Sequence, residues 1–260
     1  MKILLIVFLS LFICVNTSDI HAQKSRFPHS LYSHGGLIRL DTTSKEIYLT
    51  FTGGDFNDGA KKVIRSLKMK KVKAHFFFTG DYYRNPENKK HILKLKNRGH
   101  YLGAHSDKHL LYASWEKRDS LLISQRTFTE DLMANYQIMA EFGIKKENTE
   151  YFMPPYEWYN QQISQWTEEL GLILINFSPG TRSNADYTTP DMDNRYLSSQ
   201  YIFESILDYD STSSNGLNGF ILLLHIGTHP KRTDKFYHRL GELIDVLRER
   251  GYSFTLLSEL

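Results

Sequence analysis

Short apolar runs alternate with longer amphipathic segments along most of the chain. Seven of the short runs have the length of β-strands. They cover residues 46–51, 73–78, 100–104, 150–153, 172–176, 219–225 and 253–257. The intervening segments that have apolar positions at helical spacing are residues 58–70, 86–98, 124–142, 161–170, 198–207 and 233–250. This alternation predicts an α/β fold in which helices connect the strands of a largely parallel sheet, either open or closed into a barrel.

The first 22 residues have a different pattern. Lys2 precedes an apolar stretch from Ile3 to Val15, and Ile20-His21-Ala22 has the character of a cleavage site. The stretch is shorter than the roughly 20 residues that span a bilayer. We therefore expect a signal peptide at residues 1–22 and a mature protein that is secreted or periplasmic.

The chain's single cysteine, Cys14, lies within this leader. Ile13 precedes it, where the signal of a bacterial lipoprotein has a small residue, so we expect no stable membrane anchor after cleavage. The mature chain would then contain no cysteine, which excludes disulfides and cysteine-ligated metals. No linker, repeat or low-complexity run divides residues 23–260, which we interpret as a single domain.

The formal charge of +3 is too small to indicate a nucleic-acid partner. Basic residues cluster between Lys61 and Lys73, but apolar residues interrupt them at helical spacing. The cluster is therefore interpreted as the solvated face of an amphipathic helix.

Chemically versatile residues follow four of the predicted strands. They are Asp55 after the first strand, His105 and His109 after the third, Tyr156 after the fourth and His225 after the sixth. The carboxyl ends of parallel strands lie at one edge of a sheet, so these residues are expected to share a site.

The four-residue spacing of His105 and His109 is the most informative of these features. On one helical turn it would bring two imidazoles side by side, as a divalent metal requires. The same spacing also occurs between polar residues on a solvated helix face. His225 and His229 repeat the spacing, but in extended chain they would be about 13 Å apart and could not chelate.

The ordered motifs from Ile47 to Leu257 resemble the polysaccharide deacetylase family, also called the NodB-homology or carbohydrate esterase four family. The matching stretches are Leu49-Thr50-Phe51, Lys73-Ala74-His75-Phe76-Phe77, Gly99-His100, His105-Ser106 with His109, Pro154-Pro155-Tyr156, Asp186-Tyr187 and Leu222-Leu223-Leu224-His225. The resemblance implies a deformed (β/α) barrel, often with seven strands. It also implies metal-dependent removal of acetyl groups from a polysaccharide, with zinc the usual metal and cobalt or another divalent ion also accepted.

The resemblance assigns roles to individual residues. His105 and His109 would bind the metal, and His225 would be the general acid. The backbone N–H of Tyr156 would stabilise the oxyanion. Residues at the substrate groove would be Pro155, Tyr187 and Leu223, with Leu223 on the wall of the acetyl pocket and Asp186 tuning the charge beside Tyr187. Trp158 is a further candidate for the groove, on chemical grounds, because a flat aromatic face suits a sugar ring; the alternatives are core packing or an exposed loop aromatic.

Thr52-Gly53 stands where the family has its pair of aspartates, one a base and one a metal ligand. Asp55, two residues beyond, is the leading replacement ligand; the alternative is that it only shapes the turn before the helix. Asp58 is expected to cap that helix.

The family's Arg-Pro-Pro-Tyr motif begins here with Met153. In the family, that arginine tunes the aspartate base. The absence of both the aspartate pair and the arginine from this chain is therefore consistent with one rearranged site. Glu157 is a candidate replacement base or else a surface residue, and Arg182 either restores the missing cation or is an ordinary loop arginine.

Two functions remain in competition. The first is a deacetylase acting on an N-acetylglucosamine-containing glycan, such as peptidoglycan or a chitin-like oligomer, or on acetylated xylan. The second is a catalytically impaired carbohydrate-binding protein with the same fold.

Overall fold

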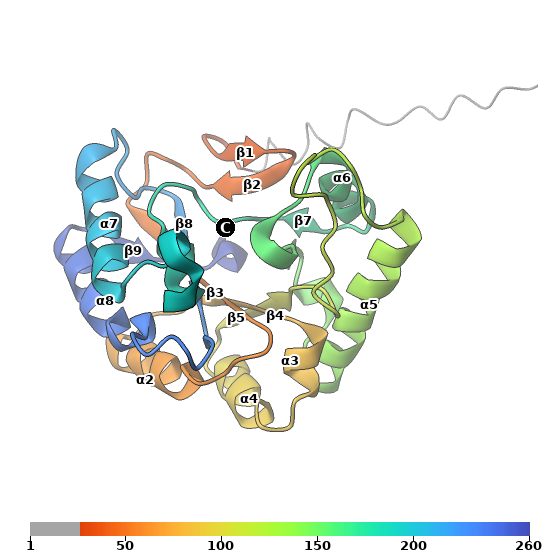
Figure 1. Ribbon diagram of the computed structural model, residues 1–260, viewed down its shortest axis with the longest axis horizontal. Coiled ribbons are helices and arrows are strands. Elements are labelled where there is room, and N and C mark those ends of the chain that lie inside the picture. Colours follow the sequence, from red (N-terminus) through yellow and green to blue (C-terminus); the bar gives the residue numbers. More distant parts are fainter. Residues whose placement is uncertain (1–26) are drawn as a thin grey trace, which may run out of the picture.

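The computed structural model describes residues 27–260, and the expected signal peptide at residues 1–22 lies outside this range. In the described part, nine strands form one curled sheet in the order β1-β2-β8-β3-β4-β5-β6-β7, with β9 also paired to β3 (Figure 1). The strands are β1 Leu31–Ser33, β2 Gly36–Arg39, β3 Glu46–Gly53, β4 His75–Phe78, β5 Tyr101–Ala104, β6 Tyr151–Phe152, β7 Ile173–Leu174, β8 Phe220–His225 and β9 Ser253–Phe254.

The seven strands β3 to β9 are mutually parallel and correspond to the seven strands that the sequence predicts. The hairpin of β1 and β2 was not predicted. Its second strand pairs antiparallel with β8 through Arg39 and Phe220. A parallel bridge between Leu37 and Ile175 connects β2 to the other edge of the sheet, beside β7. The deformed barrel expected from the sequence is thereby confirmed.

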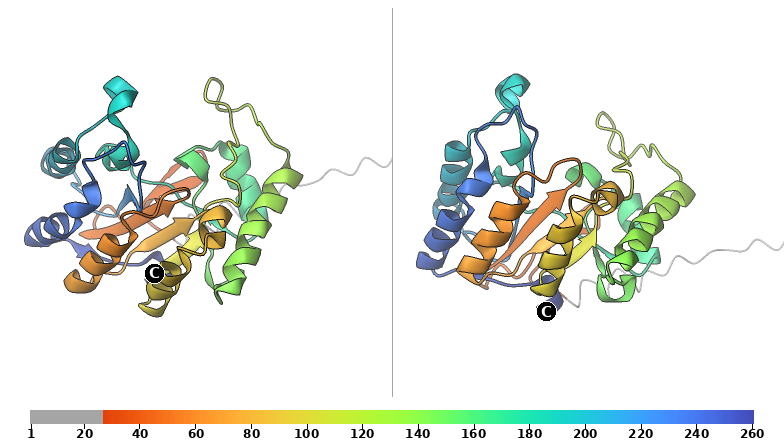
Figure 2. Two further views of the ribbon diagram at one scale, coloured as in Figure 1. Left: turned by 60° about the horizontal axis from the view of Figure 1, so that its bottom comes forward. Right: turned by 90° about the horizontal axis from the view of Figure 1, so that it is seen from below.

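Helices cover the outside of the curled sheet (Figures 1 and 2). They are α2 Ala60–Lys70, α3 Gly80–Arg84, α4 Lys89–Asn97, α5 Gln125–Glu141, α6 Gln161–Glu169, α7 Ser199–Thr212 and α8 Leu240–Glu249. Side-chain oxygens of Ser124, Asn160 and Ser198 accept backbone N–H groups in the first turns of α5, α6 and α7, which explains where these helices begin. Within residues 27–260, every helix is too short or too polar to span a bilayer.

Two details of the predicted helices are wrong. Residues 233–239 are not part of α8, because a 3₁₀ turn, η5 Phe236–His238, precedes it. Asp58 does not cap α2, whose N-cap residue is Gly59. The Asp58 carboxylate instead accepts the Thr228 N–H and the Tyr237 hydroxyl, so it ties the start of α2 to the chain after β8.

The alternation of side chains along the strands produces two cores. Outward-facing residues of β3, β4 and β8 pack against the helices. Inward-facing residues, among them Tyr48, Phe77, Tyr101, Tyr151 and Leu223, fill the barrel. This filling closes the amino-terminal part of the barrel and leaves the carboxyl ends of the strands for a site.

A buried histidine, His75, links this inner core to the end of the chain. Its Nε2 accepts the Leu257 N–H at 2.8 Å, and its Nδ1, which must then carry the proton, lies 3.1 Å from the Leu49 carbonyl oxygen. Burial lowers the pKa of His75 to about 4. The ring is therefore neutral in the folded protein at neutral pH.

We expect His75 to make the folded state sensitive to mild acid. An unfolded histidine has a pKa near 6.5, so the unfolded chain binds the extra proton first as the pH falls. The free energy of unfolding should therefore decrease between about pH 6.5 and pH 4, by on the order of 3 kcal/mol from this residue. Urea titrations should show a shallower decrease in His75→Gln but an unchanged one in the exposed control His238→Gln. Equal pH dependence in all three proteins would contradict this role.

Candidate active site

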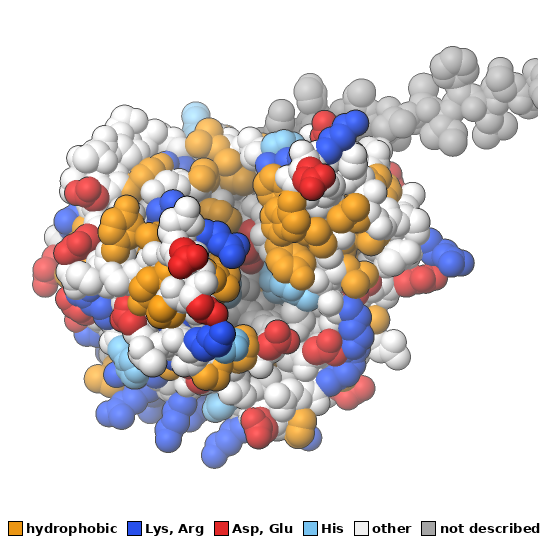
Figure 3. Space-filling model, in the orientation of Figure 1, with side chains coloured by type: hydrophobic (Ala, Val, Ile, Leu, Met, Phe, Trp, Pro, Cys, Tyr) orange, Lys and Arg blue, Asp and Glu red, His pale blue; other side chains and the backbone are white. Residues whose placement is uncertain are grey.

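A cavity of about 1110 Å³ lies above the carboxyl ends of β3, β5 and β8. The space-filling view shows the surface hollowed in this region (Figure 3). Its lining includes most of the residues that the sequence singles out: Asp55, His105, His109, Tyr156, Glu157, Tyr187 and His225. The four segments expected to converge therefore do meet.

His105 continues the inward alternation of β5 one step beyond the strand. The ring is buried, and its Nδ1 lies 2.9 Å from the Met153 carbonyl oxygen. With Nδ1 donating to that oxygen, Nε2 is left as the free nitrogen, and it lies 3.8 Å from a carboxylate oxygen of Glu157. Such an oriented, singly hydrogen-bonded imidazole is suited to bind a metal.

The helical turn expected over His105 and His109 is wrong, although the two rings do lie side by side with centroids 5.0 Å apart. The chain between them is an irregular loop, with positive φ at Ser106 (72°) and His109 (53°). The loop is held from outside by Asp131 of α5, which explains why it does not form a helix.

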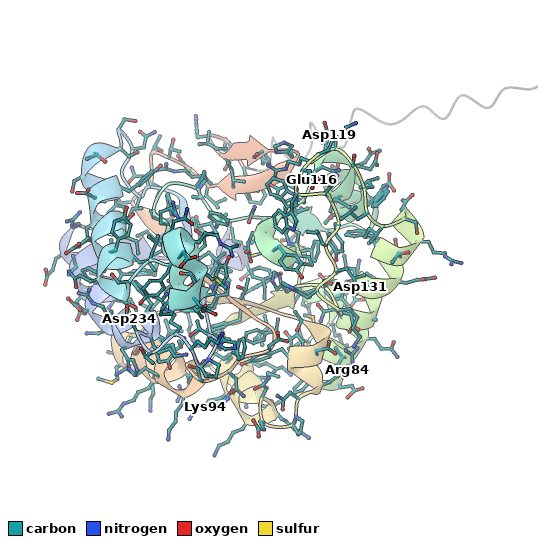
Figure 4. The ribbon with its side chains drawn as sticks, in the orientation of Figure 1. Arg84, Lys94, Glu116, Asp119, Asp131 and Asp234 are labelled. Carbon is teal, nitrogen blue, oxygen red and sulfur yellow. The ribbon has the colours of Figure 1, made fainter. Side chains whose placement is uncertain are left out.

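The Asp131 carboxylate accepts hydrogen bonds from three consecutive residues of this loop. The donors are the Ser106 hydroxyl (2.6 Å), the Asp107 N–H (3.1 Å) and the Lys108 N–H (2.9 Å). One turn later on α5, the Asn135 side-chain oxygen accepts the N–H of His105 at 2.9 Å. Helix α5 therefore determines the loop conformation, and Figure 4 shows Asp131 between this helix and the site.

Sequence reasoning missed Asp131 and Asn135. A signal was available, because both lie on the same side of α5 as the buried residues Phe128, Leu132 and Met139. Polar residues on a buried helix face need hydrogen-bond partners, and here the partners are the loop that carries the two histidines.

Both histidines of the pair are neutral at neutral pH. Burial lowers the pKa of His105 well below its ordinary value, and the neighbouring His109 lowers it further. Burial also lowers the pKa of His109, to about 4, although the charge of Asp55 opposes this shift. Neutral imidazole is the form that binds metal ions.

Asp55 lies on the rim of the cavity and is exposed. Its charge acts on His109, but in residues 27–260 no three or more His, Cys, Asp or Glu side chains are grouped closely enough to hold a metal ion. The structure therefore brings Asp55 to the same cavity without completing a three-residue ligand set. Its role as the third ligand stays a prediction.

Glu157 enters the cavity through an unusual turn. Tyr156 and Glu157 both have left-handed backbone conformations, with φ of 58° and 52°. Such conformations cost on the order of 1–3 kcal/mol each in non-glycine residues. The Asn176 side chain stabilises the turn by donating to the Glu157 carbonyl oxygen at 2.8 Å.

This turn separates the two side chains. The Tyr156 ring is exposed and lies over His109, with centroids 4.3 Å apart, whereas the Glu157 side chain is only 12% exposed. The alternative that Glu157 is a surface residue is therefore wrong. Burial and the nearby Asp186 raise the pKa of Glu157 to about 7, against the opposing effect of His225.

His225 ends β8 and faces inward at the opposite side of the cavity. Its Nδ1 lies 2.6 Å from one carboxylate oxygen of Asp186, whose other oxygen accepts the His225 N–H at 2.9 Å. Burial lowers the pKa of His225, but the charge and hydrogen bond of Asp186 outweigh it, and the net pKa is raised. This arrangement orients the ring and favours its protonated form.

The predicted groove residues divide into two groups. Tyr187 lines the cavity, with its ring centroid 5.1 Å from that of His225. Leu223 and Pro155 are buried away from the lining, and Arg182 is exposed outside it. The structure thus does not bring Leu223, Pro155 or Arg182 to the cavity.

Trp158 lies behind the wall of the cavity rather than on it. Its indole N–H donates to the Ser114 carbonyl oxygen at 3.2 Å, and its ring lies 5.1 Å from that of Trp115. Trp115 itself is 56% exposed and lines the cavity. Sequence reasoning missed Trp115 because it lies in the long connection between His109 and Ser124, which has no periodic pattern.

Comparisons with known proteins agree with this geometry. Residues 39–175 match the sequence model of the polysaccharide deacetylase family. The peptidoglycan N-acetylmuramic acid deacetylase PdaA of Bacillus subtilis is 24% identical over 220 residues, which cover 85% of this chain and 73% of that protein.

Solved structures share the fold. The structure of Bacillus subtilis PdaA superimposes with a TM-score of 0.67 at 20% identity, covering 93% of this chain and 88% of that chain. A carbohydrate esterase family 4 pseudoenzyme from Bacillus anthracis has a TM-score of 0.66 at 17% identity, covering 88% of this chain and 69% of that one. An acetyl xylan esterase from Clostridium thermocellum, solved with a cobalt ion, has a TM-score of 0.62 at 22% identity, covering 82% of this chain and 89% of that one.

We expect Asp131→Asn to loosen the loop that carries His105 and His109. The amide would direct N–H groups at backbone donors, so the free energy of unfolding should fall by about 1–3 kcal/mol. Amide hydrogen exchange at residues 107 and 108 should accelerate. The neighbouring exposed variant Glu130→Gln is the control and should change neither quantity. Unchanged exchange at these two amides in Asp131→Asn would exclude the positioning role.

Proposed function

Because the chain belongs to the polysaccharide deacetylase family, we propose that it removes acetyl groups from a polysaccharide with the aid of a divalent metal ion. The observation that carries the proposal is the convergence of three groups on one cavity. These are a pair of neutral histidines, a buried carboxylate with a pKa near 7, and a histidine held by an aspartate.

His105 and His109 are the metal ligands in this proposal. Their fit to a divalent ion rests on their neutral state and on the hydrogen bond that leaves Nε2 of His105 free. Asp55 on the rim would supply the third ligand, so the expected donor set is two imidazoles and one carboxylate. That set suits zinc, cobalt and similar ions, and we propose zinc as the principal one. When bound, such an ion polarises the acetyl carbonyl and makes a water molecule more acidic.

Glu157 is the proposed general base. A carboxylate with a pKa near 7 is substantially ionised at neutral pH and still basic enough to accept a proton from water. Its position beside His105 supports this role. Glu157 would thus replace the family's aspartate base, for which this chain has Thr52.

His225 is the proposed general acid, and Asp186 keeps it protonated and correctly oriented. The backbone N–H of Tyr156 is the proposed oxyanion donor. Among residues 27–260 no acceptor takes this N–H, so it is free to bind a developing negative charge.

We propose an N-acetylated glycan as the substrate, with peptidoglycan first because PdaA acts on it by name. Chitin-like oligomers and acetylated xylan are the alternatives. Trp115 and Tyr187 offer exposed rings to the faces of the sugars. Trp158 would support Trp115 from behind. Export of the mature chain to the periplasm or the exterior is part of the same proposal.

One observation favours a second function, that of a carbohydrate-binding protein without catalysis. Thr52 and Gly53 replace both acidic residues of the family pattern. The Bacillus anthracis pseudoenzyme shares the fold. The two functions differ in whether acetate is released.

We expect the zinc- or cobalt-loaded protein to release acetate from an N-acetylated glycan, measured by a coupled acetate assay. Glu157→Gln should lower kcat by about 10²–10⁴-fold without loss of metal, because it removes the base alone. Glu147→Gln, on an exposed 3₁₀ turn, is the matched control and should be fully active.

The outcomes separate the two functions. Metal binding without acetate from any acetylated glycan would support the binding protein. Full activity in Glu157→Gln would remove Glu157 as the base.

The raised pKa of His225 predicts a pH dependence. The acid must be protonated, so kcat/KM should fall as the pH rises through a pKa above the ordinary value of 6.5. Asp186→Asn removes the charge that raises this pKa, so the alkaline limb of the profile should move to lower pH. The control is Asp191→Asn, which alters an exposed carboxylate of the cavity wall paired with Lys231. An alkaline limb that stays in place in Asp186→Asn would contradict the assignment of His225.

A further inference from the structure

The outer surface of α2 and α4 concentrates positive charge that the catalytic proposal does not use. Residues 59–100 contain 13 of the chain's 32 Lys and Arg residues but only two of its 29 Asp and Glu residues. This segment therefore carries +11 in a chain of net charge +3, and all other residues together carry −8. Such asymmetry indicates an interaction with a negatively charged partner.

The charge lies at the surface and is not neutralised. Ten of these cations are exposed, and we call all of them except the paired Arg84 the cationic face: Lys61, Lys62, Arg65, Lys68, Lys71, Lys73, Lys89, Lys90 and Lys94. None of the nine pairs with a carboxylate in the described part of the chain. By contrast, Lys70 and Arg84, which lie beside the face, both have acidic partners.

The two helices contribute to one continuous surface. Arg98, which follows α4, donates to the Ile64 carbonyl oxygen of α2 at 3.3 Å. The pKa of His91 on α4 is lowered by burial and then by Lys94, Lys90 and, from α2, Lys61. Cations from both helices therefore surround the same ring.

Apolar side chains are exposed among these charges. Met69 is 66% exposed and Leu93 is 36% exposed. Leu93 lies in a shallow depression of about 640 Å³ whose lining includes the cations Lys89, Lys90, Lys94 and Arg98. Lysines around exposed aliphatic groups are typical of surfaces that rest on a lipid headgroup layer.

The cationic face points away from the cavity. In Figure 1 the helices α2 and α4 lie at the lower edge, and Figure 3, in the same orientation, shows a group of Lys and Arg side chains at that edge while the hollow opens toward the viewer. Figure 4 shows Lys94 at this lower edge, remote from Asp131 and the site. A partner bound there would leave the cavity open.

We propose that the cationic face holds the protein reversibly against a bilayer that contains anionic lipids. Eight of its nine cations are lysines, which act as point charges, whereas phosphate recognition in nucleic acids favours the bidentate contacts of arginine. The exposed Met69 and Leu93 distinguish a lipid surface from a soluble polyanion. This inference is independent of the proposed catalysis.

The test is cosedimentation of the purified protein with vesicles. Vesicles of phosphatidylcholine with 30% phosphatidylglycerol should bind it at low salt, and vesicles of phosphatidylcholine alone should not. Binding should weaken steeply as the salt concentration rises, because surface charges are screened.

Two sets of variants make the test specific. The triple variant Lys61→Gln, Lys90→Gln, Lys94→Gln should bind about a hundred-fold more weakly, since each cation near an anionic surface contributes roughly a five-fold factor. The matched triple variant Lys117→Gln, Arg126→Gln, Lys145→Gln removes the same charge at other exposed positions and should bind within about three-fold of the wild type.

A third variant tests the lipid itself. Met69→Ser with Leu93→Ser should weaken vesicle binding several-fold but leave binding to inorganic polyphosphate unchanged. Three outcomes would overturn the proposal: no binding to anionic vesicles at low salt, equal losses in the two triple variants, or tighter binding to polyphosphate or duplex DNA than to the vesicles. Circular dichroism confirms that each variant is folded before it is compared.

Discussion

The alternation of side chains along parallel strands is the constraint on which the site depends. Successive residues of a strand face opposite sides of the sheet, so every second residue of β3, β5 and β8 points into the barrel. Tyr48, Tyr101 and Leu223 fill the lower part of the interior. His105 lies four residues beyond Tyr101, and His225 lies two residues beyond Leu223. Both side chains therefore also face inward, and they reach the cavity at the upper end of the barrel. The packed interior supports them from below.

Burial gives the groups around this cavity different charge states. Burial removes His105 and His109 from water, and no nearby negative charge is strong enough to offset this effect. Their pKa values are therefore lowered. Burial lowers the pKa of His225 as well, but the Asp186 carboxylate outweighs this effect, and the net pKa is raised. Glu157 has a pKa near 7 because burial acts against its charge. One cavity thus combines two neutral imidazoles, a carboxylate with a pKa near 7 and an imidazole whose protonated form is favoured, which are the charge states that the proposed acetyl hydrolysis needs.

Local patterns were sufficient to predict the seven parallel strands, the family and the segments that meet at the cavity. They were insufficient where distant residues determine the local conformation. The loop from His105 to His109 is not helical, because the carboxylate of Asp131, 22 residues after His109, accepts hydrogen bonds from the loop's N–H and hydroxyl groups. Glu157 points inward because of a left-handed turn that Asn176 stabilises. Neither contact has a signature in a window of neighbouring residues.

The residues predicted at the substrate groove show the same limit of prediction from local sequence patterns. Tyr187, which was expected on the groove wall, lies in the cavity lining beside His225, because it follows Asp186, which binds that histidine. Trp115 was missed, and Arg182 and Leu223 lie outside the cavity lining, because which side of a loop or strand faces the cavity depends on packing.

In the proposed active site, His105 and His109 bind a catalytic divalent ion together with a carboxylate ligand that replaces the family's aspartate. Titration of the metal-free protein with Co²⁺, followed by visible absorption and compared with Asp55→Ala, tests it most directly. We expect the wild type to bind one Co²⁺ per chain, which Zn²⁺ displaces, and Asp55→Ala to bind Co²⁺ much more weakly. No saturable spectrum in the wild type would contradict the metal site, and an identical titration in Asp55→Ala would remove Asp55 from it.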